Sequence, residues 1–157
     1  MKTQKLLWDI EEEDKEITLG LVRLAKEVPH HELFFHINTI NSFNFSRISD
    51  FIFEGNHFDY FFPRFEGFHS DSKICIHFIG NKSYHHIQKK ISTELFSGEH
   101  ETKILLEHFQ DVDYIIKTSE PFDDFSLILL PENIVFKIQD FSLAPQEELY
   151  QIIQYYE

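Results

Sequence analysis

The stretch HFDYFF at residues 57–62 sets the fold class of this chain. Its alternate positions Phe58, Tyr60 and Phe62 are large aromatic residues, and the other set of alternate positions includes a histidine and an aspartate. This period of two predicts a strand with one buried face and one wetter face, which is typical of antiparallel sheets. We expect Pro63 to end the strand and the chain beyond it to form a hairpin with the next strand.

Other parts of the chain show similar patterns. Alternating or short apolar runs predict strands at residues 5–10, 17–24, 43–45, 50–53, 73–79, 112–117 and 134–138, with a helix as the alternative for 17–24. Apolar spacings of three and four, together with the proline positions, predict helices at residues 29–42, 86–96, 103–110 and 121–130. The clearest helix begins at Pro145, where Leu149, Ile152, Ile153 and Tyr156 form one apolar stripe.

Strands and helices are mixed without the regular alternation of a doubly wound fold. We therefore expect a single α+β domain over residues 1–157, with a mainly antiparallel sheet and helices packed on one face. In the C-terminal third, strand 112–117, helix 121–130 and strand 134–139 follow in the order of a split β-α-β unit.

The composition disfavours several classes of partner. The chain has 27 Asp and Glu against 14 Lys and Arg, a formal net charge of −13, and nonspecific affinity for nucleic acid depends on Lys and Arg. No apolar run reaches the roughly 18 residues that cross a bilayer, and the N-terminus turns acidic where a signal peptide would need small residues. The single cysteine, Cys75, excludes an internal disulfide. We expect a cytoplasmic protein without a nucleic-acid or membrane partner.

A partial motif lies two-thirds along the chain. In the segment Leu106–Tyr114, LEHFQDVDY, the residues Val112, Asp113 and Tyr114 resemble the end of the motif that names the IPExxxVDY family of small bacterial proteins. Leu106 stands in for the isoleucine, and the next two residues differ from the Pro and Glu of the family. That family has no assigned activity, so the resemblance implies no catalytic residue and no cofactor.

Exposed aromatic residues are the main candidates for a contact surface. The chain has eighteen Phe and six Tyr, and a clustered apolar patch on a monomer usually marks an interface. The candidates are Phe61, Phe65 and Phe68 around Pro63, with Tyr155 and Tyr156 in the final helix. The alternative is that these rings only contribute to a Phe-rich core.

Ten histidines raise the alternative of a metal or small-ligand site. His31 and His36 resemble the HExxH zinc motif but are five residues apart, so they diverge on a helix. Glu32 and His36 share a helix face and are the candidate ligands, with a third group from elsewhere. No Gly-x-Ser-x-Gly elbow and no glycine-rich phosphate loop is present in the sequence.

Together these patterns predict a noncatalytic protein without a cofactor that acts through protein contacts, in the simplest case as a homodimer. The alternative hypothesis is a protein that binds a metal or small ligand through histidine and carboxylate side chains.

Overall fold

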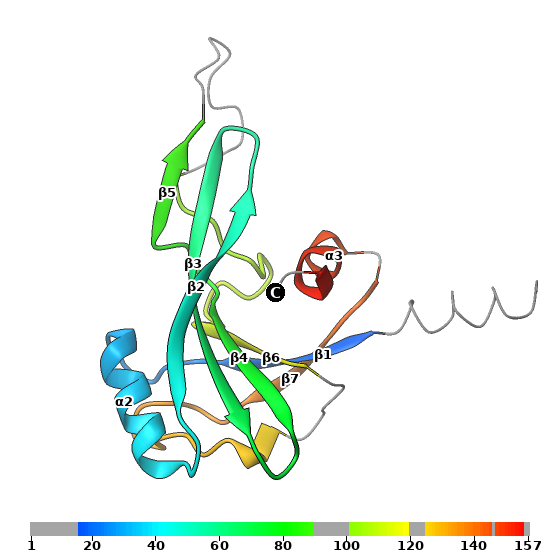
Figure 1. The fold of residues 1–157 in the computed structure, drawn as a ribbon. Coiled ribbons are helices and arrows are strands. Elements are labelled where there is room, and N and C mark those ends of the chain that lie inside the picture. Colours follow the sequence, from blue (N-terminus) through cyan, green and yellow to red (C-terminus); the bar gives the residue numbers. More distant parts are fainter. Residues whose placement is uncertain (1–15, 90–100, 120–124, 146, 156–157) are drawn as a thin grey trace, which may run out of the picture.

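The computed structural model describes residues 16–89, 101–119, 125–145 and 147–155 (Figure 1). The described strands are β1 (Ile17–Val22), β2 (Phe45–Glu54), β3 (Phe58–His69), β4 (Ile74–Gly80), β5 (His85–Gln88), β6 (Tyr114–Thr118) and β7 (Gln139–Leu143). The described helices are α2 (His30–Ile40), α3 (Glu148–Tyr155) and the 3-10 turn η1 (Phe125–Leu127). The strands form one sheet in the order β2-β3-β4-β6-β1-β7, with β5 also paired to β3, and every pair is antiparallel.

The long strand β3 organises half of this sheet. β2 pairs with it from Phe45 opposite Gly67 to Glu54 opposite Asp59. On its other side, residues 58–61 pair with β5, whereas residues 64–69 pair with β4. β4 and β5 therefore lie end to end along one side of β3.

Pro63 lies inside β3, so the prediction that it ends the strand is wrong. It falls between the part of β3 that pairs with β5 and the part that pairs with β4, and β2 has a register shift between Ile48 and Phe51 on the other side. Because proline cannot donate to a sheet ladder, a position where both ladders are interrupted tolerates it. Arg64 stabilises the bulge in β2, since its Nε donates to the Ser49 carbonyl over 3.0 Å.

The two described α-helices lie on opposite faces of the sheet. Phe34 and Ile37 of α2 belong to the core cluster that contains Ile116, whereas Ile153 of α3 belongs to the cluster that contains Ile115. Because successive strand residues point to opposite faces, the neighbours Ile115 and Ile116 mark the two sides. The structure is thus mostly antiparallel sheet with two short helices, and the expected grouping of helices on one face is not found (Figure 1).

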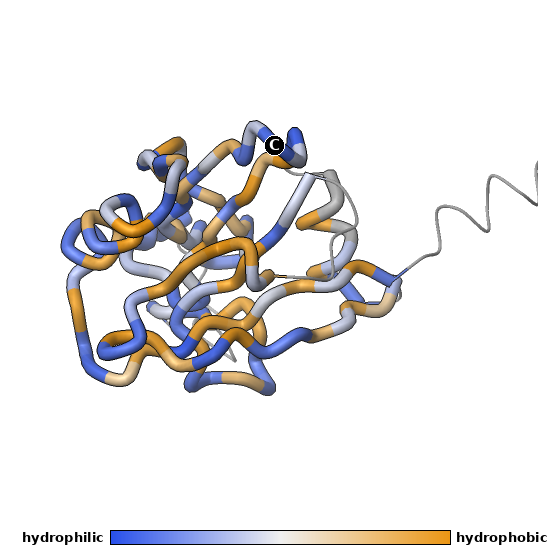
Figure 2. The backbone as a smooth tube through the Cα atoms, turned by 90° about the horizontal axis from the view of Figure 1, so that it is seen from below, coloured by the Kyte–Doolittle hydropathy of each residue, from blue (hydrophilic) through white to orange (hydrophobic). Residues whose placement is uncertain are grey.

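Aromatic rings form much of the core beneath α2. The ring of Phe34 stacks on Phe65 with 3.9 Å between centroids, and it meets Phe78 and Tyr114 edge-on at 5.2 and 5.8 Å. Offset and edge-to-face pairs of this kind add stability beyond the area that they bury. Figure 2 shows hydrophobic and hydrophilic residues alternating along much of the chain, with hydrophilic residues at many of the bends.

Several predicted elements are confirmed. Strands appear within or close to residues 17–24, 73–79 and 112–117 as β1, β4 and β6. The helices predicted at 29–42 and after Pro145 are α2 and α3. Separate strands were predicted at 43–45 and 50–53. Of the first only Phe45 is in a strand, and β2 continues from it through 50–53 because its bulge lets one strand run through the polar residues between them.

Other predicted elements differ from the structure. Residues 103–110 form turns rather than a helix, and residues 134–138 form only an isolated bridge, with strand β7 following them. β5 occupies the start of the helix predicted at 86–96, and η1 stands within the helix predicted at 121–130. The described residues do not include 90–96, 121–124 or the strand predicted at 5–10.

The strands β6 and β7 reproduce part of the predicted split β-α-β unit. Both are antiparallel to β1, which lies between them, so they are parallel to each other. The described part of their connection contains η1 in place of the predicted helix. Neither α2 nor α3 has the length and apolar character that crossing a bilayer requires.

Gly80 is required by the close approach of β4 to Pro63, and this gives a prediction about stability. A Cβ atom at Gly80 would lie 2.7 Å from Cγ and 2.8 Å from Cδ of Pro63. We expect Gly80→Ala to lower the free energy of unfolding by about 1–3 kcal/mol, as overpacking does in other cores. In a Pro63→Ala background the same substitution should cost much less, because both clashing atoms are gone. Urea unfolding of the four proteins measures this coupling, and an equal cost in both backgrounds would contradict the assignment.

Candidate functional site

One face of β3 has three successive environments. Phe65 is buried against α2, Pro63 lines a hollow, and Phe61 is partly exposed. These residues are two apart in one strand, so their side chains point to the same side of the sheet. The hollow and the exposed region beyond it are therefore the uncovered part of the face that α2 covers.

The hollow beside Pro63, which we name the motif hollow, has a volume of about 560 Å³. It is lined by Leu24, Ala25, Lys26, Glu27, Val28, Pro63, Gly80, Lys82, Gln110, Val112, Asp113 and Tyr114. All three matched positions of the VDY motif are thus part of one surface, together with the loop after β1 and the end of β4. The sequence patterns did not predict this grouping.

Asn81 holds the segment that leads into the motif. Its side chain is 1% exposed, and its Nδ2 donates to the carbonyl oxygens of Phe109 and Val112 over 3.0 Å each. Its Oδ1 accepts a hydrogen bond from the Leu106 N–H over 2.9 Å, and its own N–H donates to the Asp113 carbonyl over 3.0 Å. One buried amide therefore satisfies backbone groups along the loop, which explains why residues 103–110 do not form the predicted helix.

The two polar motif residues have raised pKa values. Desolvation by burial raises the pKa of Asp113, even though its Oδ2 accepts a hydrogen bond from the Leu24 N–H over 2.8 Å. Burial also raises the pKa of Tyr114 to about 12, and the nearby Asp113 charge adds to this effect. The Tyr114 phenol therefore keeps its proton at neutral pH and can donate a hydrogen bond in the motif hollow.

The role of Asn81 predicts a large loss of stability on truncation. Asn81→Ala would leave two carbonyl oxygens and one N–H without their buried partner. We expect the free energy of unfolding to fall by about 2–4 kcal/mol, measured by urea denaturation. Asn44→Ala, at an exposed position, is the matched control and should change stability by less than about 0.5 kcal/mol. Similar effects of the two substitutions would contradict the structural role of Asn81.

The raised pKa of Tyr114 predicts how stability changes at alkaline pH. Its pKa of about 12 in the folded protein exceeds the ordinary value of 10.0, so the unfolded chain loses the phenol proton first as pH rises. The contribution of Tyr114 to stability is complete below pH 10 and is lost between about pH 10 and 12. At about pH 11 this loss amounts to about 1 kcal/mol.

Tyr114→Phe should remove that pH dependence while keeping the ring. We expect the wild-type protein to lose about 1 kcal/mol more unfolding free energy than the variant between pH 9 and 11, measured by urea denaturation. Parallel stability curves for the two proteins over this range would show that Tyr114 titrates normally.

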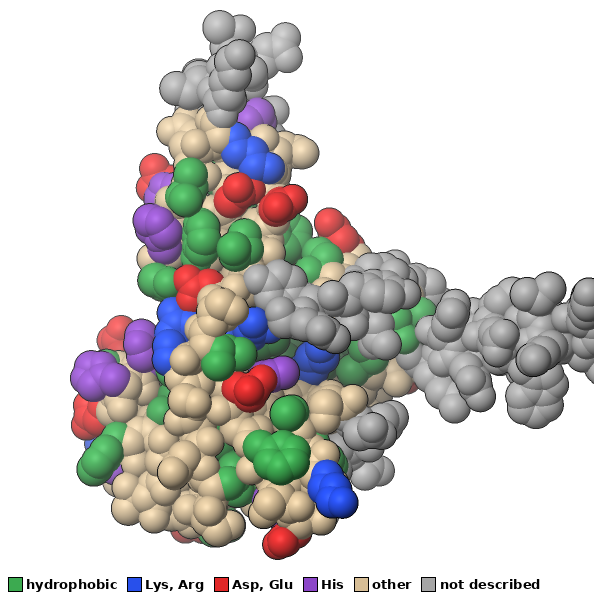
Figure 3. Space-filling model, in the orientation of Figure 1, with side chains coloured by type: hydrophobic (Ala, Val, Ile, Leu, Met, Phe, Trp, Pro, Cys, Tyr) green, Lys and Arg blue, Asp and Glu red, His purple; other side chains and the backbone are tan. Residues whose placement is uncertain are grey.

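The second candidate surface, which we name the ribbon face, lies on the three-stranded part of the sheet formed by β2, β3 and β5. It is on the same side of the sheet as α2. In the sheet register Ile52 lies opposite Phe61, and Phe61 lies opposite His85, so these side chains form one row. Ile52, Ile87 and Tyr84 are 37%, 51% and 58% exposed. Figure 3 shows hydrophobic side chains gathered on this upper part of the molecule, with charged and histidine side chains around them.

Ion pairs lie at both ends of the ribbon face. At one end the Nζ of Lys89 is 3.1 Å from a carboxylate oxygen of Asp59. At the other end Arg47 pairs with Asp50 over 2.6 Å, and Asp50 also accepts a hydrogen bond from the Tyr84 hydroxyl. This hydrogen bond is the largest cause of the raised pKa of Tyr84. The apolar row is therefore bordered by charges that are already paired.

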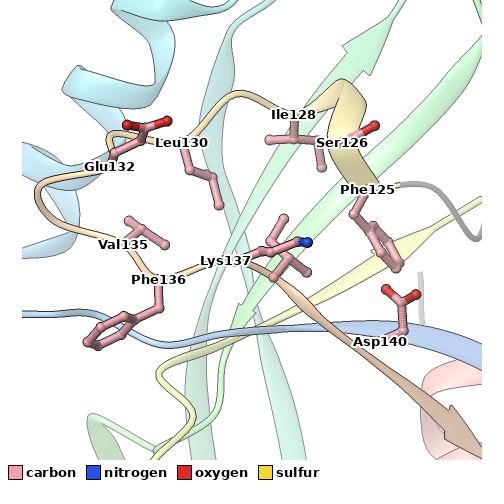
Figure 4. Close-up of a pocket in the computed structure, with 10 residues that line it drawn as sticks. Phe125, Ser126, Ile128, Leu130, Glu132, Val135, Phe136, Lys137 and Asp140 are labelled. Atoms are coloured by element: carbon pink, nitrogen blue, oxygen red, sulfur yellow. The ribbon is translucent and has the colours of Figure 1, made fainter.

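A second hollow, of about 620 Å³, lies under the chain between η1 and β7 (Figure 4). Apolar side chains line most of it, and Ser126, Glu132, Lys137 and Asp140 provide its polar groups. In Figure 4 the ring of Phe136 points away from the hollow, whereas Lys137 extends toward its middle. Both signs of charge are present without a convergent polar group, so this hollow offers no defined chemistry.

The aromatic candidates from the sequence separate in the structure. Phe61 belongs to the ribbon face, whereas Phe65 is 3% exposed and belongs to the core under α2. Phe68 is 52% exposed but lies an odd number of residues from Phe61, so it points to the other face of the sheet. The side chain of Tyr155 and the whole of Tyr156 lie outside the described residues.

The metal candidates remain an isolated pair. The Nε2 of His36 and a carboxylate oxygen of Glu32 are 4.0 Å apart on α2, and about half of each side chain is exposed. Within the described ranges no group of three or more His, Cys, Asp or Glu is placed to hold a metal ion.

Sequence reasoning did not identify Tyr84, Ile87 and Ile52 as surface residues. The apolar residues of YHHI at 84–87 are three positions apart and show no strand period, and part of this segment falls in the helix predicted at 86–96. The chain matches no family model, and no curated protein or solved structure shows significant similarity to it. Membership of the IPExxxVDY family stays a prediction.

Proposed function

We propose that this protein is a noncatalytic protein-binding module that acts through the ribbon face. The observation that carries the proposal is the exposure of Ile52 in β2, Ile87 in β5 and Tyr84 just before β5, on the two sides of β3. Contiguous exposed apolar residues with a polar border are typical of protein interfaces. The resemblance to the IPExxxVDY family, which implies a small bacterial cytoplasmic protein, is compatible with this role.

A second copy of the chain is the partner that best fits this surface. One end carries Glu54 and Asp59, which lie opposite each other in the register, with Lys89 paired to Asp59. The other end carries the ion pair of Arg47 with Asp50. A two-fold axis near the row of Phe61 and His85 would place Glu54, which forms no ion pair within the described residues, at the Arg47 end of the other copy. Such self-complementarity is what an isologous homodimer requires.

The edge strand β5 supports the same arrangement. Its sequence HHIQ has no Lys, Glu, Asp or Pro, although these are the residues that usually prevent edge strands from pairing. β3 is its strand neighbour within the described chain. The chain has a formal net charge of −13, but the exposed edge of β5 has no charge when its two histidines are neutral. It can therefore contact a second copy without charge repulsion.

Disruption of the ribbon face tests this proposal. We expect the wild-type protein to form a dimer, and Ile87→Asp to raise the dissociation constant at least about tenfold because the carboxylate would be buried without a partner. Size-exclusion chromatography with light scattering, over a range of concentrations, measures the mass. Leu129→Asp is the matched control, because Leu129 is 53% exposed at a distant loop. A strictly monomeric wild type at high concentration, or equal effects of the two substitutions, would refute the homodimer.

A further inference from the structure

We propose that the motif hollow binds a small organic monocarboxylate, with the Tyr114 hydroxyl as a hydrogen-bond donor and Lys26 and Lys82 as the balancing charges. This inference is independent of the ribbon face and of self-association. It concerns the hollow defined above, which the loop after β1, the end of β4 and the start of β6 enclose.

The hydroxyl of Tyr114 is the first observation. The residue is 7% exposed, and its ring is fixed edge-on against Phe34 and Phe78 in the core. Its hydroxyl makes no hydrogen bond to another residue in the described part of the chain. Among the described residues, Asp59 Oδ1 is the buried side-chain polar atom that has no hydrogen-bond partner, so the Tyr114 hydroxyl is not shut off from water. Tyr114 lines the hollow, and an acceptor atom of a ligand there can replace the water at its hydroxyl.

The position of Tyr114 connects this hydroxyl with the hollow. Tyr114 lies opposite Gly80 in the register of β4 and β6, and the ring of Pro63 is packed against Gly80. Pro63, Gly80 and Tyr114 all line the hollow. An acceptor atom on a ligand in the hollow would therefore satisfy the donor that the folded chain leaves free.

Two lysines supply positive charge at the hollow. Most described Lys and Arg side chains have an acidic or carbonyl partner, for example Arg23 with Asp111 at 2.7 Å and Lys117 with the Ile153 carbonyl at 2.8 Å. Neither Lys26 nor Lys82 forms an ion pair or a side-chain hydrogen bond within the described residues, although both line the hollow. Both ammonium groups are exposed, so a carboxylate in the hollow can pair with them.

Further positive potential comes from α2 and from Arg47. Val28 lines the hollow two residues before α2 begins, and Pro29 at the N-cap gives the helix no side-chain cap. The free N–H groups at a helix N-terminus favour negative charge. Arg47 is close enough to Tyr114 to act against the rise of its pKa.

The two acidic residues of the hollow limit the charge of the ligand. Glu27 and Asp113 line it together with the lysines, and Asp113 uses its Oδ2 to accept the Leu24 N–H. A polyanion such as inorganic phosphate would be repelled by these carboxylates, whereas a single negative charge can be placed beside the lysines. The apolar side chains of Leu24, Val28 and Pro63 provide contacts for a hydrocarbon part of the ligand.

Benzoate is a suitable probe because it combines one carboxylate with an apolar ring. We expect titration of the isotope-labelled full chain to shift the amide NMR signals of residues 24–28, 30, 31, 82 and 110–114 in a saturable manner. Benzylamine has the same shape with the opposite charge and should bind at least about tenfold more weakly. Inorganic phosphate should shift these signals less than benzoate does.

Substitutions then assign the groups. Tyr114→Phe removes only the hydroxyl and should weaken benzoate binding about tenfold, the value of one hydrogen bond to a charged acceptor. Lys82→Gln should weaken it about three- to tenfold, whereas Lys137→Gln, at the second hollow, is the matched control and should leave it unchanged. Because Lys82 is exposed, its substitution tests the site even if Tyr114→Phe perturbs the fold.

Several results would overturn the proposal. These are the absence of saturable shifts at the hollow, equal or tighter binding of benzylamine, unchanged affinity in both Tyr114→Phe and Lys82→Gln, or an equal loss in Lys137→Gln. Repeating the titration with Ile87→Asp separates this site from the ribbon face, because benzoate binding should not depend on the oligomeric state.

Discussion

The absence of an N–H at Pro63 constrains the sheet more than any other single feature of the described chain. A proline can occupy the middle of a twelve-residue strand only where neither neighbour needs its hydrogen bond. The chain meets this condition by a bulge in β2 on one side and by the change from β4 to β5 on the other. Gly80 at the end of β4 leaves the room that the proline ring needs.

This constraint also positions both candidate surfaces. Because β4 ends beside Pro63, the chain turns away from β3 at Asn81 and returns to it as β5, which creates the ribbon. The same turn lets Asn81 fix the loop before β6, and so brings Asp113 and Tyr114 to the edge of the motif hollow. The hollow and the ribbon face are thus two consequences of one interruption in the sheet, although their proposed ligands are unrelated.

Hydrophobic periodicity correctly predicted the elements whose buried face is visible in a short stretch of sequence. The alternation in β4 and the apolar stripe of α2 each identify an element because its buried face is visible in a short window of sequence. The prediction that Pro63 ends its strand was wrong, because the strand can continue through this proline only where β2 is bulged and β4 gives way to β5. The helix predicted at 103–110 does not form, because backbone groups of this segment hydrogen-bond to the buried side chain of Asn81, which is distant in the sequence.

The candidate surfaces were harder to predict than the fold. Phe61 and Phe65 are chemically identical, and only the position of α2 decides that Phe65 is covered and Phe61 is not. The motif residues were visible, but their meeting with the loop at Leu24–Val28 depends on the pairing of β1 with β6, which joins residues almost a hundred positions apart. A sequence pattern does not show whether a charged side chain such as Lys82 has an ion-pair partner.

The dimensions of the elements explain why apolar surface remains uncovered. α2 has eleven residues and is about 16 Å long, whereas the twelve residues of β3 extend over about 40 Å. One short helix can cover less than half of the length of its face. Phe65 is therefore buried, whereas Phe61 is only partly buried and Ile52 and Ile87 near it are exposed. Polar residues at the exposed positions of the ribbon face would favour a soluble monomer. The chain instead retains Ile52, Tyr84 and Ile87 at these positions, which is expected if a second copy of the protein completes the layer that α2 is too short to supply.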